Sequence, residues 1–206
     1  RVESTWQAYY ALDPTFILKR VEFVLSPPQT VQLSLEGSRL TAGGTAPADW
    51  IRQSRTLARA LPGLDGYDDR RLVSRSLDVL RQQLTETSIL FEQGRSNLAS
   101  PAQLQDVRRI GELLRQLDDM ARLVGAAVTV SIVGQTDIVG GPSLNRRLSE
   151  SRARAVLDAI HPASFQALTF QTRGMTPETE LQRATPAVAH PQYRRASLDV
   201  TIQPLP

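Results

Sequence analysis

The first 72 residues alternate between helical and strand-like hydrophobic patterns. Asp13 followed by Pro14 is typical of a helix start, and two prolines at 27–28 end the apolar run that follows. Residues 31–35 alternate between apolar and polar side chains, and a glycine turn after them indicates a hairpin. The predicted elements are a helix over 14–25, strands over 31–35 and from 40, a helix from about 48 to 61, and a strand within 64–72. This order is αββαβ.

The pattern after residue 87 is more regular. Pro101 opens a long helix, and Val128, Val130 and Ile132 alternate with polar residues as a strand does. The predicted elements are a strand over 88–91, a helix from 101, a strand over 128–132, a helix to about 160, and strands over 168–172 and 197–202. This order is βαβαββ. Residues 174–193 carry three prolines and no periodicity, which indicates an exposed loop.

Residues 73–86 are polar with scattered leucines and are predicted to link the two halves. A partly helical arrangement and an edge strand are both compatible with this pattern. We therefore predict an α+β protein of two small α/β sandwich domains, 1–78 and 79–206, the second with a mixed sheet covered by helices.

Composition excludes several classes of function. The 206 residues include no cysteine and two histidines, so thiol catalysis, disulfides and zinc thiolates are excluded and no metal or other cofactor is expected. The net charge is +3 and the arginines are scattered among acids, so nucleic acid is not expected as a partner. No run of eighteen apolar residues predicts a membrane span.

Catalytic motifs are also lacking. Ser149 and Ser151 have no histidine at a suggestive spacing, and Asp118 with Asp119 is typical of a helix surface. No glycine-rich phosphate loop is found. The chain is not expected to be an enzyme.

Arg152 interrupts an apolar helix stripe, since it lies four residues from both Leu148 and Val156. A cation in that position is costly without an anionic partner, and Asp137, just past a predicted strand, is the candidate. From these residues alone a structural ion pair between Asp137 and Arg152 is the favoured interpretation, and a ligand site is the alternative.

A longer signature surrounds these two residues. It consists of Gly134, Gln135, Thr136, Asp137, Gly140, Asn145, Leu148, Ser149, Arg152, Ala153 and Val156. This pattern resembles the OmpA-like peptidoglycan-binding domain, with Phe91 and Gly94 before it and Arg194 and Arg195 after it, over residues 87–203. Two positions depart from the family: Gln135 replaces the usual histidine and Tyr193 the usual asparagine.

The resemblance implies a ligand, the diaminopimelate of the peptidoglycan stem peptide, whose free end carries an ammonium and a carboxylate. Asp137 would then accept from the ammonium, and Arg152 would hold the carboxylate with two parallel donors. Thr136 and Asn145 are candidates for hydrogen bonds to the ligand or to the loop backbone, and capping of a helix or turn is an equal alternative for Asn145.

The remaining candidates lie at the rim of this pocket. They are Gln135, Gly140, Arg194 and Arg195. Gly140 and Gly141 are expected to be turn residues with positive φ. One of the two arginines should point inward from the strand and one outward, and a solvated strand end is the favoured alternative for them.

The first domain resembles the BON domain of envelope proteins through Val31 to Leu35, Gly37, Leu40, Gly44 to Ala46, Gly63 and Leu64. The two resemblances together imply a non-catalytic anchor that binds the cell wall in the periplasm of a bacterium. The alternative is an OmpA-like scaffold with a drifted pocket that binds another protein. Expected partners are the peptidoglycan stem peptide and a membrane-anchored remainder of the same chain, tethered upstream of Arg1, with a homodimer as a further candidate.

Overall fold

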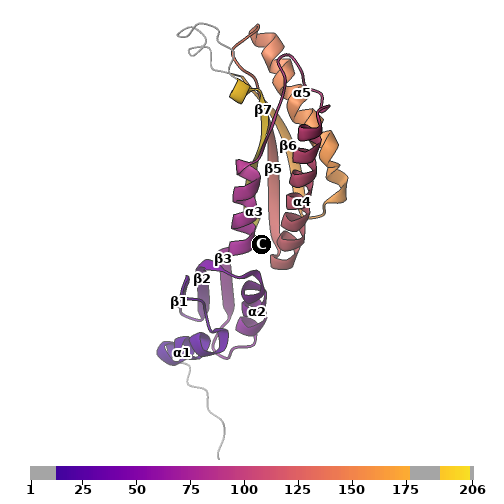
Figure 1. The fold of residues 1–206 in the computed structure, drawn as a ribbon. Coiled ribbons are helices and arrows are strands. Elements are labelled where there is room, and N and C mark those ends of the chain that lie inside the picture. Colours follow the sequence, from indigo (N-terminus) through magenta and orange to yellow (C-terminus); the bar gives the residue numbers. More distant parts are fainter. Residues whose placement is uncertain (1–12, 177–190, 205–206) are drawn as a thin grey trace, which may run out of the picture. The chain divides into compact units, whose positions relative to one another are not determined.

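The computed structural model describes residues 13–176 and 191–204 (Figure 1). Two compact units divide the chain, residues 1–76 and 77–205, each a mixed α+β structure with its own sheet. None of the described helices is both long and apolar enough to cross a bilayer.

The N-terminal unit contains the predicted αββαβ order. Its elements are α1 (Pro14–Leu25), β1 (Val31–Glu36), β2 (Arg39–Ala46), α2 (Ala48–Arg59) and β3 (Gly66–Ser74). The strands form one sheet in the order β1-β2-β3, with β1 antiparallel and β3 parallel to β2. Ile17, Val21 and Leu25 recur on one face of α1 and pack against Leu40 of β2, so this amphipathic pattern forms the core. Trp50 closes the core from α2 by donating from Nε1 to the Leu25 carbonyl at 2.7 Å.

The predicted link over 73–86 contains both of the structures left open for it, the end of an edge strand and a helix. Residues up to Ser74 belong to β3, and α3 (Arg75–Glu86) follows directly. Leu77, Leu80 and Leu84 recur at helical spacing and are buried, so the scattered leucines form an apolar stripe. The predicted domain boundary at 78/79 thus falls inside a helix.

The C-terminal unit has the predicted βαβαββ order after α3. Its elements are β4 (Ser88–Leu90), α4 (Pro101–Val124), β5 (Ala126–Gln135), α5 (Pro142–Ile160), β6 (Leu168–Met175) and β7 (Arg195–Pro204). The sheet order is β4-β7-β5-β6, in which β7 runs antiparallel to both neighbours and β6 runs parallel to β5. The sheet is therefore mixed.

Buried and partly exposed side chains alternate along β5, and this alternation explains why the helices α4 and α5 cover one face of the sheet. Val128, Val130 and Ile132 are buried and face α4 and α5, which pack on β5, while the intervening Thr129 and Ser131 are partly exposed (Figure 1). The inner face of α4 is Ile110, Leu114, Leu117 and Ala121, as its periodicity predicts. Leu104 continues the same apolar spacing toward the start of α4 but is 41% exposed.

Asp118 corrects another expectation, because it is buried and not on a helix surface. Its exposed fraction is 6%, and its Oδ1 accepts from the backbone N–H groups of Gln166 and Ala167 at 2.9 and 2.7 Å. The carboxylate thereby fixes the turn that leads into β6. The periodicity of a helix face does not reveal a partner 48 residues away.

Replacing Asp118 by alanine is expected to lower the free energy of unfolding by about 1–3 kcal/mol, because two backbone amide donors lose their buried acceptor. Chemical denaturation would measure this change. Asp118→Asn should lose less, since its amide oxygen still accepts, and Asp119→Ala, at an exposed position, should be near neutral. Equal losses for all three variants would contradict this role of the carboxylate.

The predicted exposed loop over 174–193 is shorter at both ends. Gly174 and Met175 belong to β6, and Pro191–Tyr193 forms a 3₁₀ turn. Residues 177–190 lie outside the described residues.

Candidate functional site

The strand order brings three chain segments to one edge of the C-terminal sheet. β5 ends at Gln135, and β4, which has the same direction, ends at Leu90. β7 is antiparallel to both and therefore begins at the same edge, where Phe91 N–H donates to the Arg194 carbonyl at 2.7 Å. One corner of this sheet edge is thus surrounded by the end of β5, the loop after β4 and the start of β7.

The loop after β5 holds two of the predicted site residues. Thr136 and Asp137 are 3% and 5% exposed, and Asn145 Nδ2 donates to the Asp137 carbonyl at 3.2 Å from the first turns of α5. Of the two readings kept open for Asn145, the structure shows a bond to the loop backbone. Gly140 has the expected positive φ of 106°, whereas Gly141 has φ −78° and is the N-cap of α5, so the expectation for Gly141 was wrong.

Close packing of α5 on β5 sets the position of Arg152. A Cβ on Gly134 would lie 1.9 Å from the Ser149 carbonyl oxygen, so only glycine lets the helix approach this near. The Arg152 side chain then points back along α5 toward the end of β5.

Arg152 is completely buried and bonds to the backbone. Nη1 donates to the Gln135 carbonyl at 2.6 Å, Nε to that of Arg95 at 2.9 Å and Nη2 to that of Glu92 at 3.1 Å. Its Cζ also lies 5.3 Å from the centre of the Phe91 ring, within range of a cation–π contact. The expected acidic partner of Arg152 is thus replaced by three carbonyls, each of which carries a partial negative charge.

Burial lowers the pKa of Arg152 to about 10, an effect that the Asp137 charge opposes and the Arg194 charge reinforces. The guanidinium therefore stays protonated at neutral pH. Asp137, Arg152 and Arg194 form a charged group with two cations and one anion.

The ion pair that the structure gives Asp137 is with Arg194, at 3.6 Å between Oδ2 and Nη1. This separation is too long for a charge-assisted hydrogen bond. Among the described residues, four buried side-chain atoms have no hydrogen-bond partner. Two of them, Asp137 Oδ2 and Arg194 Nε, belong to this group, and a third, Thr136 Oγ1, belongs to the residue next to Asp137. Buried polar atoms without partners are uncommon and mark a place where a bound group can satisfy them.

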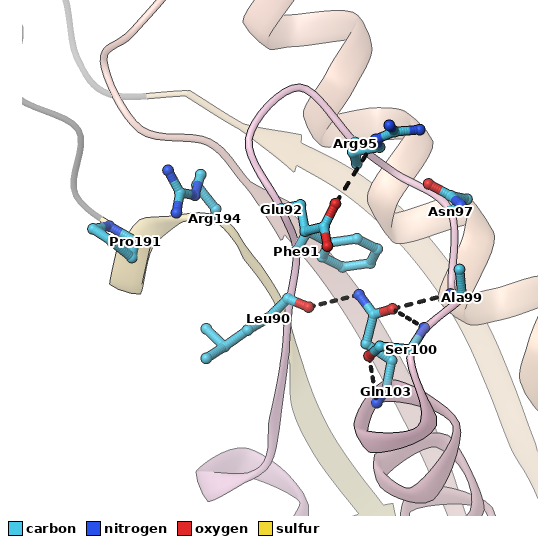
Figure 2. Close-up of a pocket in the computed structure, with 10 residues that line it drawn as sticks. All are labelled: Leu90, Phe91, Glu92, Arg95, Asn97, Ala99, Ser100, Gln103, Pro191 and Arg194. Carbon is cyan, nitrogen blue, oxygen red and sulfur yellow. Dashed lines mark hydrogen bonds and ion pairs between the residues drawn. The ribbon is translucent and has the colours of Figure 1, made fainter.

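A cavity of about 410 Å³ opens beside Arg194 (Figure 2). Its lining is Leu90, Phe91, Glu92, Arg95, Asn97, Ala99, Ser100, Gln103, Pro191 and Arg194. Figure 2 shows Arg194 and Pro191 on one side of β4 and the 95–100 segment on the other. Glu92 and Arg95 form an exposed ion pair at 3.8 Å across the loop.

Gln103 holds this loop in shape from the first turn of α4. Its Oε1 accepts from Ala99 and Ser100 N–H, both at 3.0 Å, and its Nε2 donates to the Leu90 carbonyl at 2.8 Å (Figure 2). Ser100 completes the capping box by accepting from Gln103 N–H at 3.2 Å. The Ser-x-x-Gln spacing is visible in the sequence and is the signal by which these pocket residues could have been found.

Gln135 and Arg195 lie on the opposite face of the sheet. Arg195 Nε donates to Gln135 Oε1 at 2.9 Å, and both residues line a separate hollow of about 320 Å³ with Thr85 and Glu86 at the end of α3. The two neighbouring arginines therefore point to opposite faces, as expected, and neither is a fully solvated strand end.

The predicted residues thus separate into two sets. Thr136, Asp137, Asn145, Arg152 and Arg194 come together, with Gly140 in the loop that carries them. Gln135 contributes its carbonyl to Arg152 but sends its side chain to the other face. No cluster of three metal-binding side chains is found among residues 13–176 and 191–204.

Comparisons with known proteins find relatives among envelope proteins. No protein-family profile matches the chain. The chain is 34% identical over 76 residues to the probable lipoprotein YiaD of Escherichia coli, which is 37% of this chain and 34% of that protein. It is 32% identical over 90 residues to outer membrane protein A of Serratia odorifera, which is 44% of this chain and 34% of that protein. The matches thus span about a third of the length of these relatives.

One similar solved structure is the peptidoglycan-associated lipoprotein from Burkholderia pseudomallei. The identity is 17% and the TM-score 0.42, with 61% of this chain and 99% of that chain covered.

Proposed function

We propose that the C-terminal unit is a non-catalytic module that binds peptidoglycan, through the diaminopimelate end of the stem peptide, and anchors an envelope protein to the cell wall. The observation that carries the proposal is the buried Asp137 carboxylate, whose Oδ2 accepts no hydrogen bond from the described residues and faces a cavity-lining arginine. The OmpA-like signature over 134–156 and the sequence relatives, a lipoprotein and an outer membrane protein, support it.

The chemistry of the site suits a zwitterion. Asp137 Oδ2 and Thr136 Oγ1 can both accept hydrogen bonds, and neither has a donor among the described residues. A ligand ammonium has three N–H groups that could donate to them. A carboxylate on the same ligand carbon requires a cation a few ångströms away, which Arg152 and Arg194 provide. Both ligand charges thereby meet an opposite charge in a largely desolvated place, where such interactions are strong.

The proposal is for binding without catalysis. The hydroxyl of Ser149 donates to the Arg146 carbonyl at 2.8 Å and so serves the backbone of α5. No histidine is placed to activate it among the described residues, since His161 lies at the far end of α5.

The N-terminal unit is proposed to be BON-like and to space the wall-binding unit from a membrane-bound remainder of the chain in the periplasm. Its αββαβ order supports this assignment. A second copy of the chain is proposed as a further partner.

A second candidate function is an interaction scaffold for another protein. Two observations favour it: the Gln135 side chain is directed away from the site, and Arg152 is fully buried. Two positions of the signature then serve the fold, as in a pocket that has drifted from its ligand.

Replacing Asp137 by asparagine is expected to weaken binding of a diaminopimelate-containing stem peptide roughly ten- to hundredfold, because a charge-assisted bond to the ammonium is lost. Isothermal titration with the full chain would measure this. Asp158→Asn, at an exposed acid on α5, is the matched control and should bind as the wild type does. Failure of the wild type to bind the peptide would refute the proposal and favour the scaffold.

A further inference from the structure

We infer that the chain forms a symmetric dimer in which the free edge of β1 pairs with the β1 edge of a second copy, so that the two N-terminal sheets join into one. The second copy is the further partner named in the proposed function, and the inference rests on that proposal only in this respect. It involves no residue of the candidate site, so its failure leaves the wall-binding proposal intact.

β1 is an edge strand whose outer side carries unpaired backbone groups. The sheet order is β1-β2-β3, so β1 has a neighbouring strand on one side only among the described residues (Figure 1). A two-residue turn that begins at Gly37, with φ 61°, places Glu36 and Arg39 in a hydrogen-bonded pair. Such pairs alternate along the ladder, so Leu33 and Leu35 direct their N–H and C=O groups away from β2. These four groups can pair with another strand.

Backbone bonds at the other end of β1 agree with this alternation. Thr45 N–H of β2 donates to the Thr30 carbonyl at 3.2 Å, so the even-numbered residues of this segment bond to β2. Val31 N–H donates at 2.9 Å to the Pro28 carbonyl, before the strand, and not to β2. Because Val31 N–H is already occupied, the N–H groups available at the free edge are those of the two leucines.

A pairing centred on Ser34 uses both leucines. With two copies of β1 antiparallel about this residue, each Leu33 lies opposite Leu35 of the second copy. Four backbone hydrogen bonds then form across the edge, and the leucine side chains meet on the face that packs against α1. On the other face Gln32 lies opposite Glu36, and Ser34 lies opposite its own copy, so no like charges are opposed.

Two core leucines of the N-terminal unit remain partly open to solvent at this edge. Leu33 and Leu35 pack against the cluster that α1 forms with Leu40, but both are only partly buried. Leu40, the register partner of Leu35 on β2, is completely buried. The difference is that β2 has a strand on each side, and a second β1 would give β1 the same cover.

The opposite edge of this sheet is protected against such pairing. β3 carries four consecutive charged residues, 68–71, and its register with β2 shifts there, between Thr41 and Gly43. Charged side chains and bulges keep an edge strand from pairing. β1 has an unbroken register, and its single charged residue, Glu36, is its last. The joined sheet therefore ends in two protected β3 edges, and assembly stops at a dimer.

The chain contains no cysteine, so single cysteines test this register directly. In the pairing centred on Ser34 the two Cα atoms at this position are about 4.5 Å apart, within the range of a disulfide. S34C is therefore expected to form a covalent dimer under mild oxidation. T41C, at the register partner of Ser34 on β2, would be three strand spacings, about 14 Å, from its copy and should not. Q53C, at an exposed position of α2, measures crosslinking by random collision.

Sedimentation velocity of the full chain over a concentration series measures the dimer without crosslinking. S34K places two like charges opposite each other and should raise the dissociation constant of the dimer about two- to fivefold, whereas Q53K should leave it unchanged. Ser34 is exposed, so its variants are expected to fold, and circular dichroism checks that they do.

A wild type that stays monomeric over the whole series would overturn the inference and leave the β1 edge to a strand of another protein. Crosslinking of S34C that is no faster than that of Q53C would also overturn it. A dimer that S34K does not weaken has the same consequence, because the two copies then meet at another surface.

Discussion

Replacing Arg152 by methionine should lower the free energy of unfolding of the C-terminal unit by about 3–5 kcal/mol, the cost typical of removing one partner from a buried charged network. Methionine fills much of the volume but donates no hydrogen bond, so the carbonyls of Glu92, Arg95 and Gln135 lose their partner. Asp137 also loses the attraction of a neighbouring cation, whereas Arg194 loses the repulsion of a like charge. The loop that lines the cavity should then detach from the end of β5.

Urea denaturation followed by circular dichroism measures this loss, and hydrogen exchange at residues 91–100 localises it. Arg154→Met is the control, because Arg154 lies on the same helix with a side chain 68% exposed, and its pair with Asp158 is a surface one. Such a pair contributes little, so a change within about 0.5 kcal/mol is expected. A similar, small effect for both variants would contradict the stabilising role of Arg152.

Gly134→Ala should destabilise the same unit by more than about 3 kcal/mol, a large overpacking effect. The added Cβ would lie 1.9 Å from the Ser149 carbonyl oxygen and 2.9 Å from the Ala153 nitrogen. These are backbone atoms of α5, so no side chain can rotate to relieve the clash. The helix must move away from β5, and Arg152 then loses its reach to the Gln135 carbonyl.

Gly111→Ala, at a glycine inside α4, should increase the stability of the unit where Gly134→Ala lowers it. The nearest atoms to its added Cβ belong to the flexible Arg115 side chain at 3.9 Å, so no clash arises. Alanine is expected to stabilise the unit by about 0.5–1 kcal/mol through helix propensity. Thermal unfolding of both variants tests the pair, and equal effects at the two glycines would show that packing against α5 is not the cause.

Local patterns account for most of the elements. The apolar spacing in α1 and α4 and the alternation in β1 and β5 depend on residues within a few positions of one another, and the structure contains these elements where the pattern predicts them. The segment over 73–86 was predicted only as a link, partly helical or an edge strand, because its leucines are separated by polar residues, and only its packing shows that they form a stripe.

The sequence was sufficient to predict which residues form the candidate site, but not which atoms they contact. Arg152 is recognisable in the sequence as a cation on an apolar stripe, and Asp137 as an acid after a strand. Their partners are not, because Arg152 bonds to carbonyls as far as 60 residues away and Asp137 pairs with Arg194 of another strand end. The same holds for Asp118, whose partners lie in the turn before a distant strand.

By itself, the sequence determined most of the helices and strands, their order within each unit and the residue types that gather at one edge of the second sheet. These follow from periodicity and turn chemistry, which act over short stretches of chain. Only the tertiary structure decided that Arg152 is buried among carbonyls while Arg194 lines the cavity. The physical reason is that burial and pairing depend on strand order and helix packing, which bring together residues far apart in the chain.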